Sequence, residues 1–267
     1  FYLAHPRLVR LEHSQMFEAE GSTHDWCMKL LRHETAHAFD NAYRLHRRAA
    51  WRRTFGKYSL PYRDAYEANT TSKSYVQHLG AWYAQSHPAE DYAETFSVWL
   101  APHSNWQEVY ADWPALKKLQ ALDRLLHEVG GDKPVVTTRD RDESLPKLRY
   151  TLREHYRRRR GYYGVQMPWR HDTELRLLFS DPEAGGRALR AATFLQQNRV
   201  DLRAKVSALT GQYRYVVDQA LDAMMQRCRE LDLRLSRPKH QARLGAAVLT
   251  TMVTLALARG RKPRFRR

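Results

Sequence analysis

Two histidines and a glutamate stand at the spacing of a metal-binding helix. The segment His33-Glu34-Thr35-Ala36-His37 places its histidines four residues apart, and residues four apart lie on one face of an α-helix. His33 and His37 can therefore direct two imidazoles at one ion, and neutral imidazole is a good Zn²⁺ ligand. Glu34 projects beside them, where it can take a proton from a metal-bound water. The pattern predicts hydrolysis by a zinc-activated water, and the alternative is a surface helix with two solvated histidines.

A second segment offers the acids that such a site still needs. A catalytic zinc has three protein ligands and one open position, and Glu90 and Glu94 stand one helical turn apart. One of these acids can complete the ligand set, and the other can accept the free ring N–H of a ligand histidine. The alternative is that both acids lie on a solvated helix face.

Both segments resemble known zinc peptidases. His33 to His37 looks like the zinc helix of gluzincin metallopeptidases. Residues 89–96 resemble the corresponding helix in the catalytic domain of anthrax lethal factor, and that likeness covers roughly residues 25–100. A bacterial group known only as zinc-binding metallopeptidases is also similar, including residues 148–156 of the basic half. The resemblance implies a zincin-like fold, Zn²⁺ as the cofactor and hydrolysis of peptide bonds.

The resemblance also implies a role for each residue of the site. It makes His33, His37 and Glu90 the zinc ligands, and it makes Glu94 a support behind them. In the catalytic mechanism that follows, Glu34 is the general base.

A tyrosine completes the pattern that the resemblance implies. Tyr83 stands seven residues before Glu90, at the position that faces the zinc in the lethal-factor pattern. Its hydroxyl would help to stabilise the developing oxyanion. Tyr75 and Tyr92 are the alternatives for this role, and an aromatic residue beside a core helix often serves packing alone.

The sequence departs from the usual motifs at three positions. Ala36 replaces the usual glycine before the second histidine, which keeps a small residue there. No third histidine follows at the metzincin spacing, because Asp40 and Tyr43 stand three and six residues after His37. This argues against a metzincin. The long interval from His37 to Glu90 means that their pairing depends on the motif similarity.

Helices must position these residues. Ser22 and Asp25 are spaced as a capping box, which predicts a helix from about residue 24 to 47. Pro88 suits the first turn of a helix that ends near Leu100. Residues 1–20 contain short extended candidates, and residues 51–75 are polar and irregular. Helical spacing continues over residues 114–129, 146–160, 186–209, 213–235 and 240–258. We therefore expect a mainly α (α+β) fold, with a zincin-like domain that has little sheet, followed by a basic helical bundle.

Charge divides the 267-residue chain. Its net charge is +16, and the whole excess falls in residues 131–267, whereas residues 1–130 are neutral and hold ten of the 13 histidines. We expect a zincin-like catalytic domain over residues 1–130 and a basic helical C-terminal domain over residues 131–267, with a seam near Gly130. The chain begins with Phe1 rather than Met, so we expect the first domain to be truncated at its N-terminus.

Composition bounds the class of protein. Apolar residues make up 43% of the chain, which excludes a mainly disordered protein. Cys27 and Cys228 form no disulfide framework, so a reducing, cytoplasmic location is expected. The longest apolar stretch, residues 245–258, is too short to span a bilayer. We expect it to form a buried helix of the bundle, and we expect no membrane partner.

Several interpretations of partners and function stay open. A basic domain beside a neutral one can steer an acidic peptide or protein substrate, while the arginine run of residues 157–160 and the basic tail could bind nucleic acid. The sequence leaves the oligomeric state open. The alternatives to a peptidase are a zinc amidohydrolase on a non-peptide amide and a non-catalytic basic nucleic-acid- or protein-binding module on a zincin fold. Cap, loop or core positions are expected for the remaining candidate histidines, which are His24, His78, His87 and His103.

Overall fold

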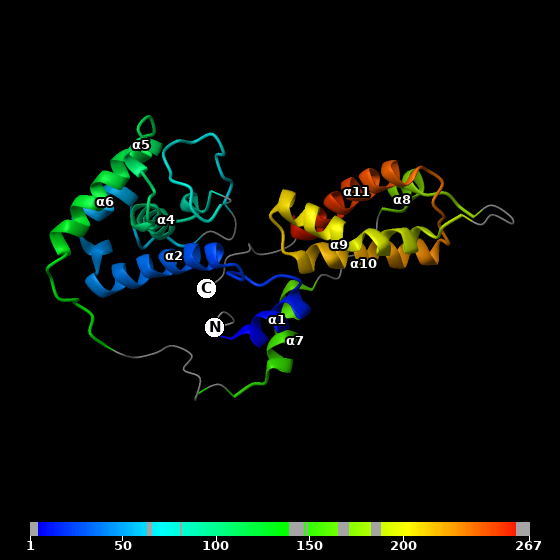
Figure 1. Ribbon diagram of the computed structural model, residues 1–267, viewed down its shortest axis with the longest axis horizontal. Coiled ribbons are helices and arrows are strands. Elements are labelled where there is room, and N and C mark those ends of the chain that lie inside the picture. Colours follow the sequence, from blue (N-terminus) through cyan, green and yellow to red (C-terminus); the bar gives the residue numbers. More distant parts are fainter. Residues whose placement is uncertain are drawn as a thin grey trace. The chain divides into compact units, whose positions relative to one another are not determined.

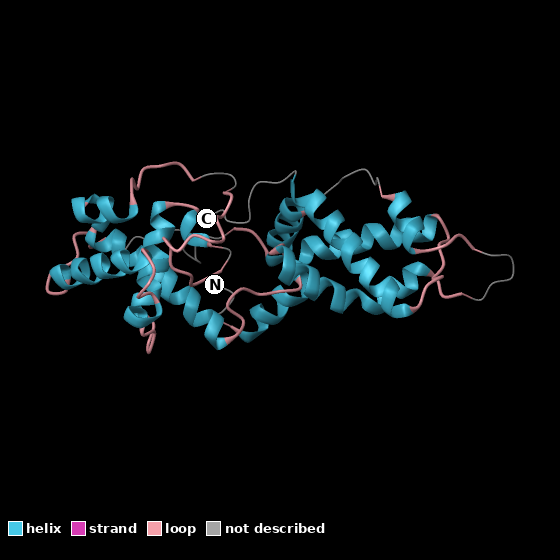
Figure 2. Ribbon diagram, turned by 90° about the horizontal axis from the view of Figure 1, so that it is seen from above, coloured by secondary structure: helices cyan, strands magenta, loops and turns pink. Residues whose placement is uncertain are grey.

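The computed structural model describes residues 5–62, 66–80, 82–138, 147, 149–164, 171–182 and 188–259. The chain forms two compact units, one of residues Glu20–Lys147 and one that joins Tyr2–Ala19 to Leu148–Arg267. Helices dominate both units (Figure 1, Figure 2), and the described β-structure consists of two isolated bridges. The predicted mainly α fold with little sheet is therefore confirmed.

The first unit is built around α2 (His24–Tyr43) and α4 (Pro88–Leu100), which pack against each other. Thr23, rather than Ser22, caps α2, because its hydroxyl accepts the backbone N–H of Trp26 at 3.3 Å. Pro88 begins α4 as predicted, at a position where the missing N–H costs nothing. The remaining helices of this unit are α3 (Ala49–Phe55), α5 (Trp106–Val109), α6 (Ala115–Val129) and the short 3₁₀ turns η2 (Leu45–Arg47) and η3 (Tyr83–Gln85).

The helix α4 is buried along almost its whole length. Tyr92 and Phe96 pack with Trp51 of α3 and Leu122 of α6 into the core of the unit. On α6, Lys118 binds the buried Asp91 at 2.6 Å. Contacts on several sides hold α4 in place, so its acidic side chains have a fixed position.

The segment between α3 and α4 is mostly irregular, as its polar composition predicts. The beginning of the expected irregular stretch is nevertheless helical, since α3 extends to Phe55. Gly56 then ends α3 with a φ of 108°, which only glycine adopts readily. The chain returns to the core at η3, which packs against α4.

The second unit contains a helical bundle, as predicted. Its long helices α9 (Ala191–Thr210), α10 (Arg214–Glu230) and α11 (Lys239–Arg259) pack on one another, and α10 and α11 also pack on α8 (Asp172–Leu178). Leu249 and Val253 of α11 lie in the bundle core, whereas Val248 and Met252 are exposed, so only one face of the helix predicted to be buried is covered. No described helix is both long enough and apolar enough to cross a membrane. The basic tail of residues 260–267 lies outside the described residues.

The N-terminal segment differs from the prediction. Residues expected to be extended form α1 (Pro6–Met16), capped by the ring nitrogen of His5. Glu12 of α1 is buried and accepts the hydroxyl of Tyr156 at 2.7 Å, and it also pairs with Arg159 at 2.7 Å. Both partners belong to α7 (Leu152–Tyr163), so α1 is part of the second unit. The units meet in sequence at Lys147 rather than near Gly130.

Candidate metal centre

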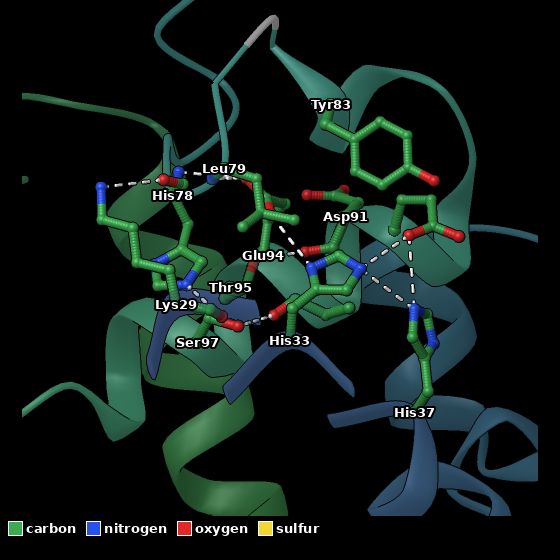
Figure 3. A network of polar contacts seen from close by, with 12 residues as sticks. Lys29, His33, His37, His78, Leu79, Tyr83, Asp91, Glu94, Thr95 and Ser97 are labelled. Carbon is green, nitrogen blue, oxygen red and sulfur yellow. Dashed lines mark hydrogen bonds and ion pairs between the residues drawn. The ribbon is translucent and has the colours of Figure 1, made fainter. Parts of the chain in front are cut away.

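Three donor atoms from two helices converge in the first unit. Nε2 of His33 lies 3.2 Å from Nε2 of His37, one turn further along α2. Oε2 of Glu90, on α4, lies 3.0 Å from the first nitrogen and 3.3 Å from the second. Figure 3 shows the rings of His33 and His37 directed toward the same space.

The separations of these atoms fit one zinc ion. A tetrahedral zinc with bonds of about 2.0–2.1 Å keeps its ligand atoms roughly 3.3 Å apart. The three distances at this centre lie close to that value, and the donor set of two imidazoles and a carboxylate is one that zinc prefers. Among the described residues, the group that could hold an ion consists of His33, His37 and Glu90. Three protein ligands are the complement of a catalytic zinc, which keeps one position open.

Burial makes the charges of this cluster depend on each other. His33 is 3% exposed and Glu90 is 4% exposed. Burial lowers the pKa of His33, but hydrogen bonds to Glu90 and Glu94 outweigh it and raise this pKa to about 9. Burial likewise raises the pKa of Glu90, but hydrogen bonds from His33, His37 and Tyr62 hold it well below its ordinary value. The carboxylate is therefore ionised and available to a cation.

Glu94 lies behind His33, on the side away from the other donors. Its Oε1 is 3.1 Å from Nδ1 of His33, and its Oε2 accepts the backbone N–H groups of His78 and Leu79, each at 3.0 Å. Figure 3 shows this network on the opposite side of the His33 ring from His37. An ionised acceptor at Nδ1 places the ring proton there, which leaves the lone pair of Nε2 for a metal.

Tyr83 lies at the edge of the cluster. Its ring centroid is 5.7 Å from that of His33, and η3 carries it there. Burial, together with the charge of Glu90, raises the pKa of Tyr83 far above its ordinary value, so the hydroxyl stays protonated. The two alternative tyrosines lie elsewhere. Tyr75 lies under the ammonium group of Lys118, and Tyr92 is buried in the aromatic core.

Glu34 follows His33 on α2, and its side chain is exposed to solvent. This exposure differs from the burial of His33 and Glu90. The neighbouring Asp40 is buried and binds the backbone N–H and the ring of His46, at 2.7 and 2.9 Å. It therefore ties the end of α2 to the following turn.

The structure adds one residue that the sequence reasoning missed. The hydroxyl of Tyr62 donates a hydrogen bond of 2.6 Å to Oε1 of Glu90. Tyr62 stands in an irregular segment, where no periodic pattern relates it to the helices. The high tyrosine content of that segment was the only available signal.

The other candidate histidines lie outside the donor cluster. His24 begins α2 at the surface, and His87 caps α4 by accepting the N–H of Ala89. His78 contacts the backbone oxygen of Lys29 through its ring at 3.0 Å.

The comparisons with known proteins agree with this chemistry. Residues 27–111 match the model of a family described as "Putative zinc-binding metallo-peptidase". Searches of curated proteins and of solved structures gave no match, so the likeness to the lethal-factor domain stays a prediction. The matched residues include α4, α2 from Cys27 onward and every donor atom of the cluster. The part of the chain that carries the candidate metal centre is therefore similar to a family of zinc-binding metallopeptidases.

Proposed function

We propose that this protein is a zinc-dependent metallopeptidase that hydrolyses peptide bonds. The observation that carries the proposal is the convergence of His33 Nε2, His37 Nε2 and Glu90 Oε2 within 3.3 Å of one another. The donor set leaves a coordination position for water, and the same segment matches the zinc-binding family.

In this proposal, each residue around the centre has a separate role in hydrolysis. Bound zinc would lower the pKa of a coordinated water and polarise the carbonyl group of the substrate. The carboxylate of Glu34 takes the proton of the attacking water and passes it to the leaving amine. The protonated hydroxyl of Tyr83 donates a hydrogen bond to the oxygen that gains negative charge. Glu94 keeps the imidazole of His33 in the tautomer that binds metal.

The substrate in this proposal is a peptide or protein with acidic character. The second unit carries exposed arginines on α7, where the side chains of Arg157 and Arg158 are 77% and 65% exposed. Such a surface raises the local concentration of acidic chains near the enzyme, and this effect weakens with added salt.

Replacing Glu34 tests the catalytic role. Glu34→Gln keeps the shape of the side chain but removes the base, so zinc should stay bound while hydrolysis of a peptide library falls by at least about a hundredfold. Asp25→Asn is the matched control, because Asp25 is an exposed acid on the same helix. Wild-type turnover should also disappear with a chelator and return with zinc. Full activity of Glu34→Gln, or zinc-loaded wild type that hydrolyses no peptide, would overturn the proposal.

A further inference from the structure

The carboxylate of Glu90 has two oxygens with different partners. Oε2 faces both histidine nitrogens, at 3.0 and 3.3 Å. Oε1 instead accepts the hydroxyl of Tyr62 at 2.6 Å, which is a short and well-formed hydrogen bond. The oxygen that faces the donor cluster is therefore distinct from the oxygen that the tyrosine holds.

A histidine fixes the ring of Tyr62 in this position. The rings of Tyr62 and His87 are stacked, with centroids 3.9 Å apart and planes at 13°. Nδ1 of His87 accepts the N–H of Ala89, so the ring proton lies on Nε2, which donates to the carbonyl oxygen of Leu60 at 2.8 Å. His87 thus joins the start of α4 to the chain on both sides of Pro61, and it stands three residues before Glu90.

We propose that Tyr62 is a positioning residue for the metal centre, which holds Oε1 of Glu90 so that the carboxylate offers Oε2 alone to the cation. This inference rests on the proposed function, because it assigns Tyr62 a part in the zinc site of that enzyme. A carboxylate held through one oxygen binds a metal through the other, which keeps a coordination position open for water and substrate. Without the hydroxyl, Glu90 is free to rotate and to offer both oxygens.

Three groups contact the carboxylate of Glu90 within hydrogen-bond distance, and Tyr62 is one of them. The remaining two are the ligand histidines, whose nitrogens would turn to the metal. With a metal bound, the hydroxyl of Tyr62 would be the donor, of these three, that still contacts the carboxylate of Glu90.

The test compares two tyrosines with the same neighbour. Tyr62→Phe keeps the ring that stacks on His87 and removes only the hydroxyl. Tyr58→Phe is the control, because the ring of Tyr58 also contacts His87, with centroids 6.3 Å apart, and lies outside the donor cluster. Zinc affinity is measured by competition with a chelating dye, and bound Co²⁺ replaces zinc as an optical probe of the coordination geometry.

We expect Tyr62→Phe to weaken zinc binding by about tenfold or more, and to change the visible absorption of bound Co²⁺. Tyr58→Phe should leave both unchanged, and circular dichroism should show that both variants keep their helices. Unchanged zinc affinity and an unchanged cobalt spectrum in Tyr62→Phe would overturn the inference while the proposed function stands. Wild-type protein that binds no zinc would overturn the proposed function, and the inference with it.

Discussion

Nδ1 of His33 lies 3.1 Å from Oε1 of Glu94, and this contact determines which ring nitrogen faces the other donors. Both residues are almost fully buried, so water does not compete for the contact. The second oxygen of Glu94 is occupied by two backbone N–H groups, which fix the carboxylate from the side of the irregular segment. The orientation of the His33 ring on α2 therefore depends on a loop and on a second helix.

Glu94→Gln should weaken zinc binding by about 10- to 100-fold. A glutamine has one accepting atom, whereas Glu94 accepts from His33 with one oxygen and from two backbone N–H groups with the other. In either orientation of the glutamine amide, its NH₂ group would therefore face another N–H donor, either the His33 ring or the two backbone N–H groups. Zinc affinity by dye competition checks this prediction.

Glu108→Gln is the matched control for that variant, because Glu108 is an exposed acid of the same unit on α5. Equal zinc affinity in Glu94→Gln and Glu108→Gln would show that Glu94 does not support the centre.

Zinc binding should become stronger as the pH rises toward about 9. In the metal-free protein, hydrogen bonds to Glu90 and Glu94 outweigh burial and raise the pKa of His33 to about 9. Below that pH the ring is protonated, and a bound metal must displace the proton. The apparent association constant should therefore increase by up to about tenfold per pH unit between pH 6.5 and 8.5, and less steeply above pH 9. Titrations at several pH values test this, and an affinity that does not change with pH would contradict it.

The sequence predicted the helices that carry the centre because their signals are local. The i, i+4 pair of His33 and His37 and the proline at the start of α4 need no knowledge of the tertiary structure. The helix α1 was missed because much of its stabilisation is tertiary. Only Glu12 and Met16 of that helix are buried, and Glu12 depends on partners in α7 that lie far away in sequence.

The same distinction explains what could be predicted of the site. The three proposed ligands and Glu94 follow from residue types at helical spacing and from a family resemblance. The contacts of Tyr62, and those of the backbone at His78 and Leu79, arise where an irregular segment folds back on α4. No periodicity relates such a segment to a helix, so residue types alone could not assign these partners.

Asp218→Ala should destabilise the second unit by roughly 2–3 kcal/mol. Asp218 of α10 is 4% exposed and binds Arg199 and Arg203 of α9, with its Oδ1 at 2.8 and 2.7 Å from their nitrogens. Its removal leaves two largely buried arginines without their shared partner. The loss is smaller than for a fully buried pair, because both guanidinium groups keep some contact with water. Urea unfolding followed by far-ultraviolet circular dichroism measures the change.

Asp201→Ala provides the comparison for Asp218→Ala. Asp201 pairs with Lys205 one turn along α9, and both side chains are largely exposed. Such a pair contributes about 0.5 kcal/mol or less. If both variants changed the free energy of unfolding equally, the buried network would not stabilise the bundle as described.

The zinc content of the purified protein tests the central claim most directly. Elemental analysis should find about one zinc per chain in the wild type, and nearly none in His37→Ala after dialysis against a weak chelator. His103→Ala, which removes an exposed histidine outside the cluster, should retain the wild-type content. A wild-type protein that holds no zinc even after reconstitution, or a His37→Ala variant that holds as much as the wild type, would contradict a zinc centre at His33, His37 and Glu90.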